Sequence, residues 1–452
     1  MTYRARAKLA TAALSLALVA AACGDSKSET TSSTTGAPGA TAGGSGTTTA
    51  GGPFRVNDAS CPPAAKAPLA AGAPIKIGVS LPQSGALAAF GALGPGMKTY
   101  FEKVNADKAG VAGHKIELVV KDDGYDPGRT VANTTQLIEE DKIFASSLYV
   151  GTPNVQRSRK AFEDSCTPQL FVGTGAPEWG DPTTHQWTVG GILAYNTEAN
   201  IWADYISQKK PGAKVAQLVF NNDFGKSYQR TFEKAAKDKG LNIVETKLHE
   251  GTAPNIDNET AAILAAQPDY VLGETTGAFC PRLMGGLAKG GYKGKTIMSS
   301  TCAAVQSFFK PIDPAGNGVL LIAAQKDPSD PQYANDPAIV TYKADIAKHG
   351  GGANANDGSI LTGYNIAALL VDSLEKAAAL PGGLTRVNLM NAAWNADFTL
   401  PLAISGKAKM DGKTDAYIVE TVEFTAYDAA KGSQVPTGDK FDSEAKTGTF
   451  AA

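Results

Sequence analysis

The sequence predicts an α/β protein with two similar lobes, each a parallel sheet covered by helices. From Ile75 onward, strand-like apolar runs alternate with helix-like periodicity, the pattern of parallel strands joined by helical connections. The same alternation starts again near Tyr195, which indicates a second unit. The chain has 452 residues, 43% of them hydrophobic and 19% charged, so it can bury two cores in a globular protein.

The first lobe is predicted to hold strands joined by helices. Apolar residues recur at helical spacing over 97–104 and define one buried face. Asp126 followed by Pro127 is typical of a helix start, because the carboxylate caps free N–H groups and Pro fits the first turn. This helix should run to about Glu139. The strands are expected at 75–80, 116–121, 143–150 and 169–172.

The second lobe is predicted from the same alternation. Its helices are expected at 195–208, 225–239, 258–266 and 281–289, and its strands at 214–220, 243–248, 270–272 and 296–299. A strand at 319–323 then leads back to helices of the first lobe at 337–349, 359–379 and 386–393. Residues 417–427 alternate as a final strand would.

The chain is expected to cross between the lobes three times, so that three strands form a hinge. The crossings are placed at 189–194, at 316–323 and after Pro401. The resulting lobes would be 75–190 with 324–400, and 191–318 with 401–445. Few crossings permit rotation, and the lobes should close by a hinge motion.

The N-terminus indicates export. Residues 1–22 are predicted to be a signal peptide, since basic residues precede an apolar run that is too short to span a bilayer. Three alanines, Cys23 and Gly24 resemble a bacterial lipobox, so Cys23 would receive lipid; cleavage by the ordinary signal peptidase is the alternative. Residues 23–60, rich in Ser, Thr, Gly and Ala, are expected to be a flexible tether. We therefore expect a protein anchored to the outer face of the cell membrane.

Four further cysteines suggest two disulfides, because an exported chain meets an oxidising compartment. Four cysteines allow three pairings. Cys280 and Cys302 each follow a predicted strand, and these strands are joined by one helix, so both should emerge at one sheet edge. This favours a Cys280–Cys302 bridge and leaves Cys61 with Cys166.

Several motifs resemble the type I extracytoplasmic solute-binding proteins of ABC transporters, in the leucine/isoleucine/valine-binding branch. They are IKIGVSLPQSGALAAFG at 75–91, Val-Ala-Gly at 111–113, the aspartates before Pro127, and NNDFGKS at 221–227. The resemblance implies two Rossmann-like lobes in a type I periplasmic binding protein fold. It also implies capture of a small polar solute, such as an amino acid, an amide or a small carboxylate, and delivery to ABC transporter permease subunits. A ligand sensor for a signalling system and an unrecognised secreted hydrolase are the alternatives.

Candidate ligand-binding residues of the first lobe lie in loops after strands, where parallel sheets bind ligands. Ser84 could offer a hydroxyl or could belong to a packing turn, and Phe90 would form an apolar wall. The resemblance implies that Gly151 and Thr152 hold a ligand carboxylate at a helix N-terminus, with further contacts from Thr174.

Candidate residues of the second lobe are expected on cleft loops outside the core, and these are Tyr195, Phe224, Glu274, Thr276 and Thr301. Amino-acid-binding relatives carry a carboxylate for the ligand ammonium near the position of Ser300 or Thr301, and this chain lacks it there. Glu274 is a candidate replacement, because a buried ammonium without a partner is strongly disfavoured. Amides, small carboxylates and aromatic acids are the other ligands considered.

No catalytic, cofactor or metal motif is found in the sequence. His114, His185, His249 and His349 lack metal-ligand spacing. The chain also lacks a phosphate loop, a dinucleotide fingerprint and a Gly-x-Ser-x-Gly elbow. With 42 basic and 44 acidic residues spread along the chain, nothing indicates nucleic-acid binding. We expect a monomer that is not an enzyme.

Overall fold

The computed structural model describes residues 52–444, 446 and 447. The predicted signal peptide, the lipidation site Cys23 and most of the predicted tether lie outside these residues. Within the described part of the chain, no helix is both long and apolar enough to cross a membrane.

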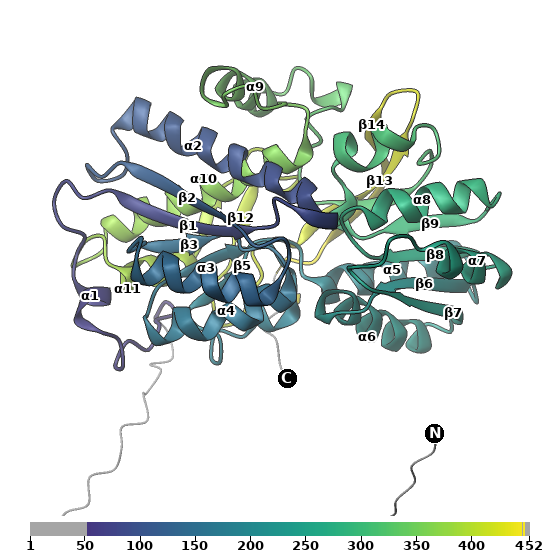
Figure 1. The fold of residues 1–452 in the computed structure, drawn as a ribbon, viewed down its shortest axis with the longest axis horizontal. Helices are drawn as coiled ribbons and strands as arrows, with labels where there is room; N and C mark the ends of the chain where they lie inside the picture. Colours follow the sequence, from purple (N-terminus) through teal and green to yellow (C-terminus); the bar gives the residue numbers. More distant parts are fainter. Residues whose placement is uncertain (1–51, 445, 448–452) are drawn as a thin grey trace, which may run out of the picture. The chain divides into compact units, whose positions relative to one another are not determined.

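The first lobe is built on a five-stranded parallel sheet in the order β2-β1-β3-β4-β5 (Figure 1). The four predicted strands are present, although the third is shorter than expected. The fifth was not predicted, because its three residues are too few to show a periodicity. The strands are β1 (Ile75–Leu81), β2 (Ile116–Asp122), β3 (Ala145–Ser147), β4 (Gln169–Val172) and β5 (Thr188–Gly190).

Helices cover both faces of this sheet. Strand β1 has Gly78 where α3 approaches, since a Cβ there would lie 3.1 Å from Cδ2 of Leu137 on α3 and 2.8 Å from Cδ1 of Ile143. Met97 of α2 packs with α10 and α11 in the core on the other face. The start of α3 is as predicted, because the Asp126 side chain accepts from the Arg129 N–H at 2.8 Å. The helices are α2 (Leu93–Lys108), α3 (Pro127–Glu139), α4 (Thr152–Asp164), α9 (Pro337–His349), α10 (Gly358–Ala378) and α11 (Arg386–Trp394).

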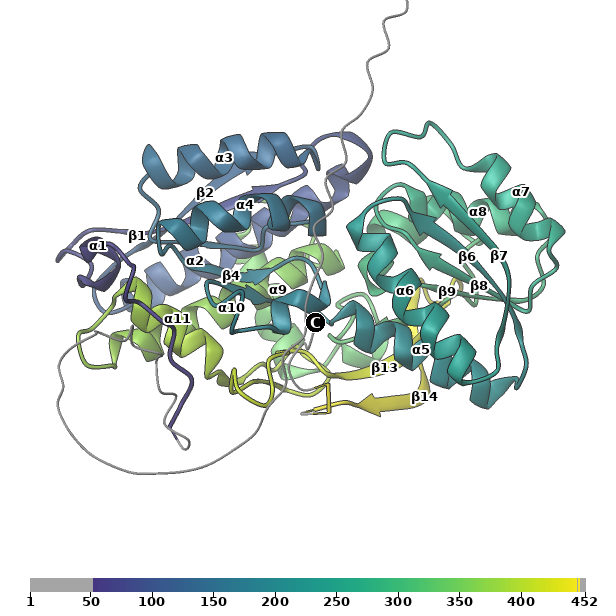
Figure 2. The same cartoon turned by 90° about the horizontal axis from the view of Figure 1, so that it is seen from below.

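The second lobe is built on a seven-stranded sheet in the order β14-β13-β10-β9-β8-β6-β7. Five strands are parallel, and the last two strands of the chain run antiparallel at one edge, where Figure 2 shows them in yellow. The final strand was not predicted, because it contains Pro436 and several charged residues. The strands are β6 (Lys214–Phe220), β7 (Asn242–His249), β8 (Tyr270–Glu274), β9 (Lys295–Met298), β10 (Leu320–Ala323), β13 (Thr421–Asp428) and β14 (Ser433–Asp442).

Side chains of this sheet alternate between two helical layers. On β8, Leu272 packs with α5 and α6, whereas Val271 packs with α8 on the opposite face. The helices are α5 (Tyr195–Lys209), α6 (Asp223–Asp238), α7 (Asp257–Ala265) and α8 (Phe279–Lys289). Both sheets and their helical layers give the two-lobed α/β architecture that the sequence predicts.

The third crossing between the lobes lies later in the chain than residue 401, where the sequence placed the boundary. Residues 402–404 run beside the second crossing, since Lys326 N donates to Leu402 O at 2.9 Å. The strands β11 (Asp397–Thr399) and β12 (Lys407–Lys409) follow, and Met410 and Ile418 pack in the first-lobe core. Residues 401–418 therefore belong with the first lobe, because their apolar side chains are buried there.

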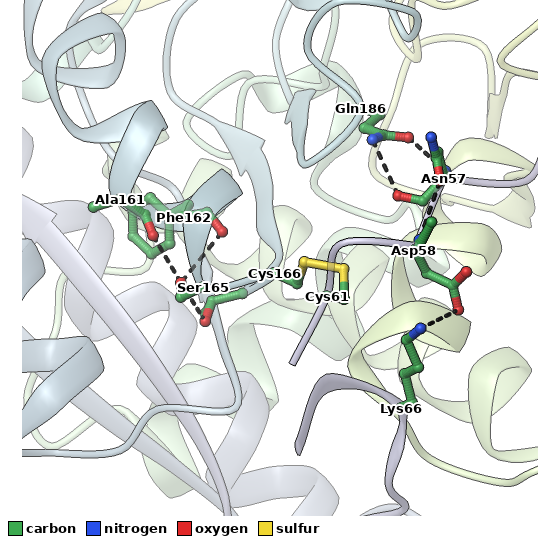
Figure 3. Close-up of a disulfide and its surroundings, with 11 residues drawn as sticks. Asn57, Asp58, Cys61, Lys66, Ala161, Phe162, Ser165, Cys166 and Gln186 are labelled. Carbon is green, nitrogen blue, oxygen red and sulfur yellow. Dashed lines mark hydrogen bonds and ion pairs between the residues drawn. A yellow bond between two sulfur atoms is a disulfide. The ribbon is translucent and has the colours of Figure 1, made fainter. Parts of the chain in front are cut away.

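The first described residues form a strap (residues 54–61) on the first lobe, although composition had assigned them to the tether. The Phe54 ring packs on Trp394 at 5.6 Å, and Val56 is buried. Figure 3 shows Asn57 exchanging two hydrogen bonds with Gln186 beside the Cys61–Cys166 disulfide. These contacts show that the strap is part of the folded lobe.

Both favoured disulfides are present. The Cys280–Cys302 bridge joins α8 to the short 3₁₀ helix η3 (Ser300–Cys302), directly after β9. The Cys61–Cys166 bridge joins the strap to the turn before β4. The first bridge therefore fixes a loop at the carboxyl end of the second-lobe sheet, as its position after two neighbouring strands predicted.

Candidate functional site

A cavity of about 230 Å³ lies between the lobes. It is lined by residues that follow β3, β4, β8 and β9, which places it outside the carboxyl ends of both parallel sheets. Residues of all three crossings also line it, among them Ile192, Ile322 and Val419. Six of the ten candidate binding residues lie on its wall, and these are Phe90, Gly151, Tyr195, Phe224, Thr276 and Thr301.

The first-lobe wall is centred on the start of α4. Gly151 is the N-cap residue with φ of 101°, a left-handed conformation that favours glycine. A Cβ at this position would lie 2.4 Å from Cε2 of Tyr125, so the site also needs glycine for space. This wall therefore presents the N-terminus of a 13-residue helix, where N–H groups and the helix dipole favour an anion.

Thr152 and Thr174 lie behind this wall and do not line the cavity. Their hydroxyl groups are hydrogen-bonded to each other at 2.7 Å, and both side chains are buried. Both also hydrogen-bond to the hydroxyl of Tyr195, whose pKa burial raises to about 12. The two threonines thus hold Tyr195 in place against the first lobe.

Ser84 is also placed away from the cavity wall. Its hydroxyl donates to Asp122 Oδ2 at 2.7 Å, and the same carboxylate accepts from the N–H groups of Gln83 and Gly124. Burial opposes ionisation of Asp122, but these hydrogen bonds outweigh it and lower its pKa to about 2. Ser84 therefore fixes the shape of the loop that carries Phe90.

The second-lobe wall is aromatic. Tyr195 is 1% exposed and Phe224 is 2% exposed, and their rings meet edge to face at 5.1 Å. The Tyr195 ring also stacks on Tyr228 at 4.5 Å, and Tyr228 stacks on Trp202. The expectation that Tyr195 and Phe224 lie on loops outside a core is wrong, because they begin α5 and α6 and pack in the second-lobe core.

A buried carboxylate lies directly behind this wall. Glu198, in the first turn of α5, accepts three hydrogen bonds of 2.7 Å from the Tyr228 hydroxyl, the Ser300 N–H and the Ser300 hydroxyl. Burial raises the pKa of Glu198 to about 7, although these hydrogen bonds lower it in part. Ser300 itself lines the cavity, so Glu198 is separated from the ligand site by one hydrogen-bonded residue.

Glu274 does not line the cavity, which removes it as a partner for a ligand ammonium. It is the last residue of β8, two positions after Leu272, and therefore points to the same buried face as that residue. Its side chain is fully buried, and neither carboxylate oxygen has a hydrogen-bond partner among the described residues. Burial, reinforced by the charge of Glu233, raises its pKa well above the usual range.

Tyr125 is a cavity residue that the sequence did not reveal. Its backbone has φ of 65°, held by a hydrogen bond from its N–H to Asp123 Oδ1 at 2.9 Å. Its ring crosses the cleft and stacks on Phe220 of the second lobe at 6.0 Å. The available signal was its position between Asp123 and Asp126, directly after a strand of a parallel sheet, where ligand-binding loops lie.

The lobes are in contact across the cleft in this structure. The N–H of Ala278 in the second lobe donates to the carbonyl of Ala86 in the first lobe at 2.9 Å. The rings of Phe90 and Phe308 also face each other across the cleft at 6.3 Å. These two contacts bring the lobes together beside the cavity.

The described residues contain no group of three or more His, Cys, Asp or Glu side chains that could hold a metal ion. His249 is buried, with Nε2 2.7 Å from the Thr275 hydroxyl, and burial lowers its pKa to about 4. His185 is hydrogen-bonded to Arg159 at 2.7 Å. Neither histidine lines the cavity.

Comparison with known proteins agrees with this architecture. The chain matches the family of periplasmic binding proteins over residues 74–431. It therefore belongs to the periplasmic binding protein family, which places its function outside the cytoplasm. A search of curated proteins finds no match.

Several solved structures share the fold at low sequence identity. A branched-chain amino acid ABC transporter protein from Thermus thermophilus with bound valine has a TM-score of 0.73 and 19% identity, covering 83% of this chain and 97% of that chain. A fatty acid ABC transporter substrate-binding protein from Thermomonospora curvata has a TM-score of 0.71 and 24% identity, covering 82% and 93%. A solute-binding protein from R. palustris in complex with 4-hydroxybenzoate has a TM-score of 0.69 and 18% identity, covering 81% and 97%. These similarities establish the type I periplasmic binding protein fold.

Proposed function

We propose that this protein is an exported solute-binding lipoprotein, anchored through Cys23, that captures a carboxylic acid with an apolar body and delivers it to an ABC importer. The observation that carries the ligand class is the composition of the cavity wall. Gly151 offers an anion-binding helix N-terminus, while Phe90, Leu148, Val150 and Phe224 surround it with apolar side chains.

An α-amino acid fits this part of the wall less well than the corresponding acid. Glu274 points into the core, and the oxygens of Glu198 are already occupied by donors from Tyr228 and Ser300. Neither of these two carboxylates is therefore available as a direct partner for an ammonium beside the α4 terminus. The ligands named for the similar structures, a fatty acid, 4-hydroxybenzoate and valine, share a carboxyl group, which supports an acid as the common feature.

The size of the cavity sets the size of the solute. An apolar cavity of about 150 Å³ takes one benzene molecule, so a volume of about 230 Å³ leaves room for a few further heavy atoms. This is the size of a small aromatic or branched aliphatic acid. Binding of the solute should shift the protein from an open population towards a closed one.

Thermal unfolding with matched ligand pairs tests the ligand class. We would compare 4-methylpentanoate with leucine and 3-methylbutanoate with valine. A ligand at one hundred times its Kd stabilises the fold by about 2.7 kcal/mol. The acids should raise the melting temperature more than their amino counterparts. Tighter binding of the amino acids, or binding of neither series, contradicts the proposal.

Two measurements address the anchor and the motion. Mass spectrometry of the membrane fraction should find a lipid-modified Cys23 at the mature N-terminus, and an unmodified N-terminus at another residue would disprove the anchor. Small-angle scattering should give a smaller radius of gyration once the acid identified above is added.

A further inference from the structure

Glu198 lies in a hydrogen-bonded arrangement that the ligand class alone does not explain. An ionised carboxylate has no hydrogen to donate, so the three groups around Glu198 must all donate to it. The Ser300 hydroxyl is one of them, at 2.7 Å from Oε2. Its hydrogen is therefore committed to Glu198, and because Ser300 lines the cavity, its oxygen can offer a ligand only lone pairs.

We propose that Glu198 makes Ser300 Oγ an obligatory acceptor and so selects acids that carry a hydroxyl group at the end that reaches the second lobe. This inference rests on the proposed function and names a second feature of the same ligand. Glu198 is a positioning residue, because it acts on the ligand through Ser300.

The surroundings of Glu198 support this role. The side chain is fully buried, and its neighbours are the phenol groups of Tyr195 on the same helix and Tyr228 on α6, together with Ser300 on η3. Burial raises the pKa of both phenols, to about 12 for Tyr195, so both stay neutral. Glu198 is therefore the group of this cluster that titrates near neutral pH.

Protonation of Glu198 should change the Ser300 hydroxyl from an acceptor to a donor on the cavity side. A neutral carboxylic acid can donate to Ser300 Oγ, which releases the serine hydrogen towards the cavity. The Ser300 hydroxyl can then donate to a ligand acceptor such as an ether oxygen. Because burial raises the pKa of Glu198 to about 7, the preference for a hydroxyl should be strong above neutral pH and weaken as the pH falls through about 7.

A neutral hydroxyl fits this position better than an ammonium. The Ser300 oxygen is uncharged, and the Glu198 carboxylate behind it already holds three donors. An ammonium against Ser300 would lose its hydration for a single neutral acceptor.

The test uses benzoates with a hydroxyl, a methoxy or an amino-methyl group at the 3- or 4-position, with benzoate as the reference. Calorimetry of the purified protein gives the ratio of Kd values for each methoxy and hydroxy pair between about pH 5.5 and pH 8.5, where the benzoates are ionised. At about pH 8.5 the hydroxy compound should bind about tenfold more tightly than the methoxy compound. This preference should become smaller as the pH falls towards about 5.5.

Three variants separate the roles. Glu198→Gln can donate an amide hydrogen to Ser300 Oγ, so its ratio should fall by about tenfold and lose its pH dependence. Ser300→Ala should give the same small ratio at every pH and reports the steric cost of the methoxy group alone. Glu274→Gln removes a buried carboxylate of the same lobe that is away from the cavity, and its ratio should match that of the unmodified protein.

The outcomes divide cleanly. If no benzoate and no aliphatic acid binds, the proposed function fails. If benzoates bind but the ratio of Kd values is the same in Ser300→Ala as in the unmodified protein, the Glu198 inference is overturned while acid binding stands. The same holds if the amino-methyl compound binds more tightly than the hydroxyl compound. If Glu198→Gln does not fold, the pH profile of the unmodified protein against that of Ser300→Ala decides the question alone.

Discussion

The first-lobe wall of the cavity is made of a glycine at a helix terminus among apolar side chains, whereas the second-lobe wall is made of aromatic rings over a buried carboxylate. Gly151 belongs to the first wall, and Tyr195, Phe224 and Glu198 belong to the second. The first wall offers donors from the backbone, so its polarity is set by the fold. The second wall is part of a core, so its ligand contacts and its stability depend on the same residues.

The largest expected effect is that of Phe224→Ala. This substitution leaves a hole in the second-lobe core as well as in the cavity wall, and buried Phe→Ala changes cost about 3–5 kcal/mol. Urea unfolding should show this loss of stability together with weaker ligand binding. Val340→Ala, at a side chain that is 51% exposed, is the control and should change stability little. A stable Phe224→Ala protein would show that this wall is separable from the core.

The first wall should respond differently to Gly151→Ala. The added Cβ would push the Tyr125 ring away from its stacking contact with Phe220, so closure and ligand affinity should suffer by tenfold or more. The strained backbone should add about 1–3 kcal/mol of destabilisation.

Gly113→Ala provides a matched control for this change. Gly113 has φ of 82°, and a Cβ there would meet nothing within 4 Å. It should therefore cost a similar amount of stability and leave ligand affinity unchanged. If Gly151→Ala and Gly113→Ala bind the ligand equally well, the position of the Tyr125 ring does not affect ligand affinity.

The smallest effect is expected for Glu274→Gln, behind the second wall. Because burial raises the pKa of Glu274 in the folded state, its contribution to stability is fully present below its unfolded pKa and is lost as pH rises through the folded pKa. The Gln variant should therefore be more stable than the unmodified protein at pH 8, and the difference should shrink towards pH 4. Glu233 lies on the exposed side of α6. In urea unfolding, the stability difference between Glu233→Gln and the unmodified protein should therefore change less with pH. If the stability difference between Glu274→Gln and the unmodified protein does not change with pH, burial does not raise the pKa of Glu274.

Much of the fold could be predicted from local patterns. The strand β1 and the cap at Asp126 follow from apolar runs and from one Asp-Pro pair, and both depend only on neighbouring residues. The Cys280–Cys302 bridge followed from two strand ends that a parallel sheet brings together. These features are local or are fixed by sheet topology.

The second wall could not be predicted in the same way. Glu198 in the first turn of a helix resembles an ordinary charge that complements the helix dipole, and its burial depends on α6 and η3, which lie far along the chain. For Glu274, the predicted strand ended at residue 272, whereas β8 continues to Glu274, so the pleat of the strand turns its side chain into the core. Tyr125 gained its role only through a ring contact with the other lobe.

The strap of residues 54–61 has a mechanical consequence. All of its described contacts, including the Cys61–Cys166 bridge and the packing of Phe54 on Trp394, are with the first lobe. A pulling force applied to the N-terminal residues would therefore enter the molecule beside β4 and α11 and bypass the three crossings. The first lobe would act as the fixed base and the second lobe as the swinging arm, so opening and closing would proceed without load on the hinge.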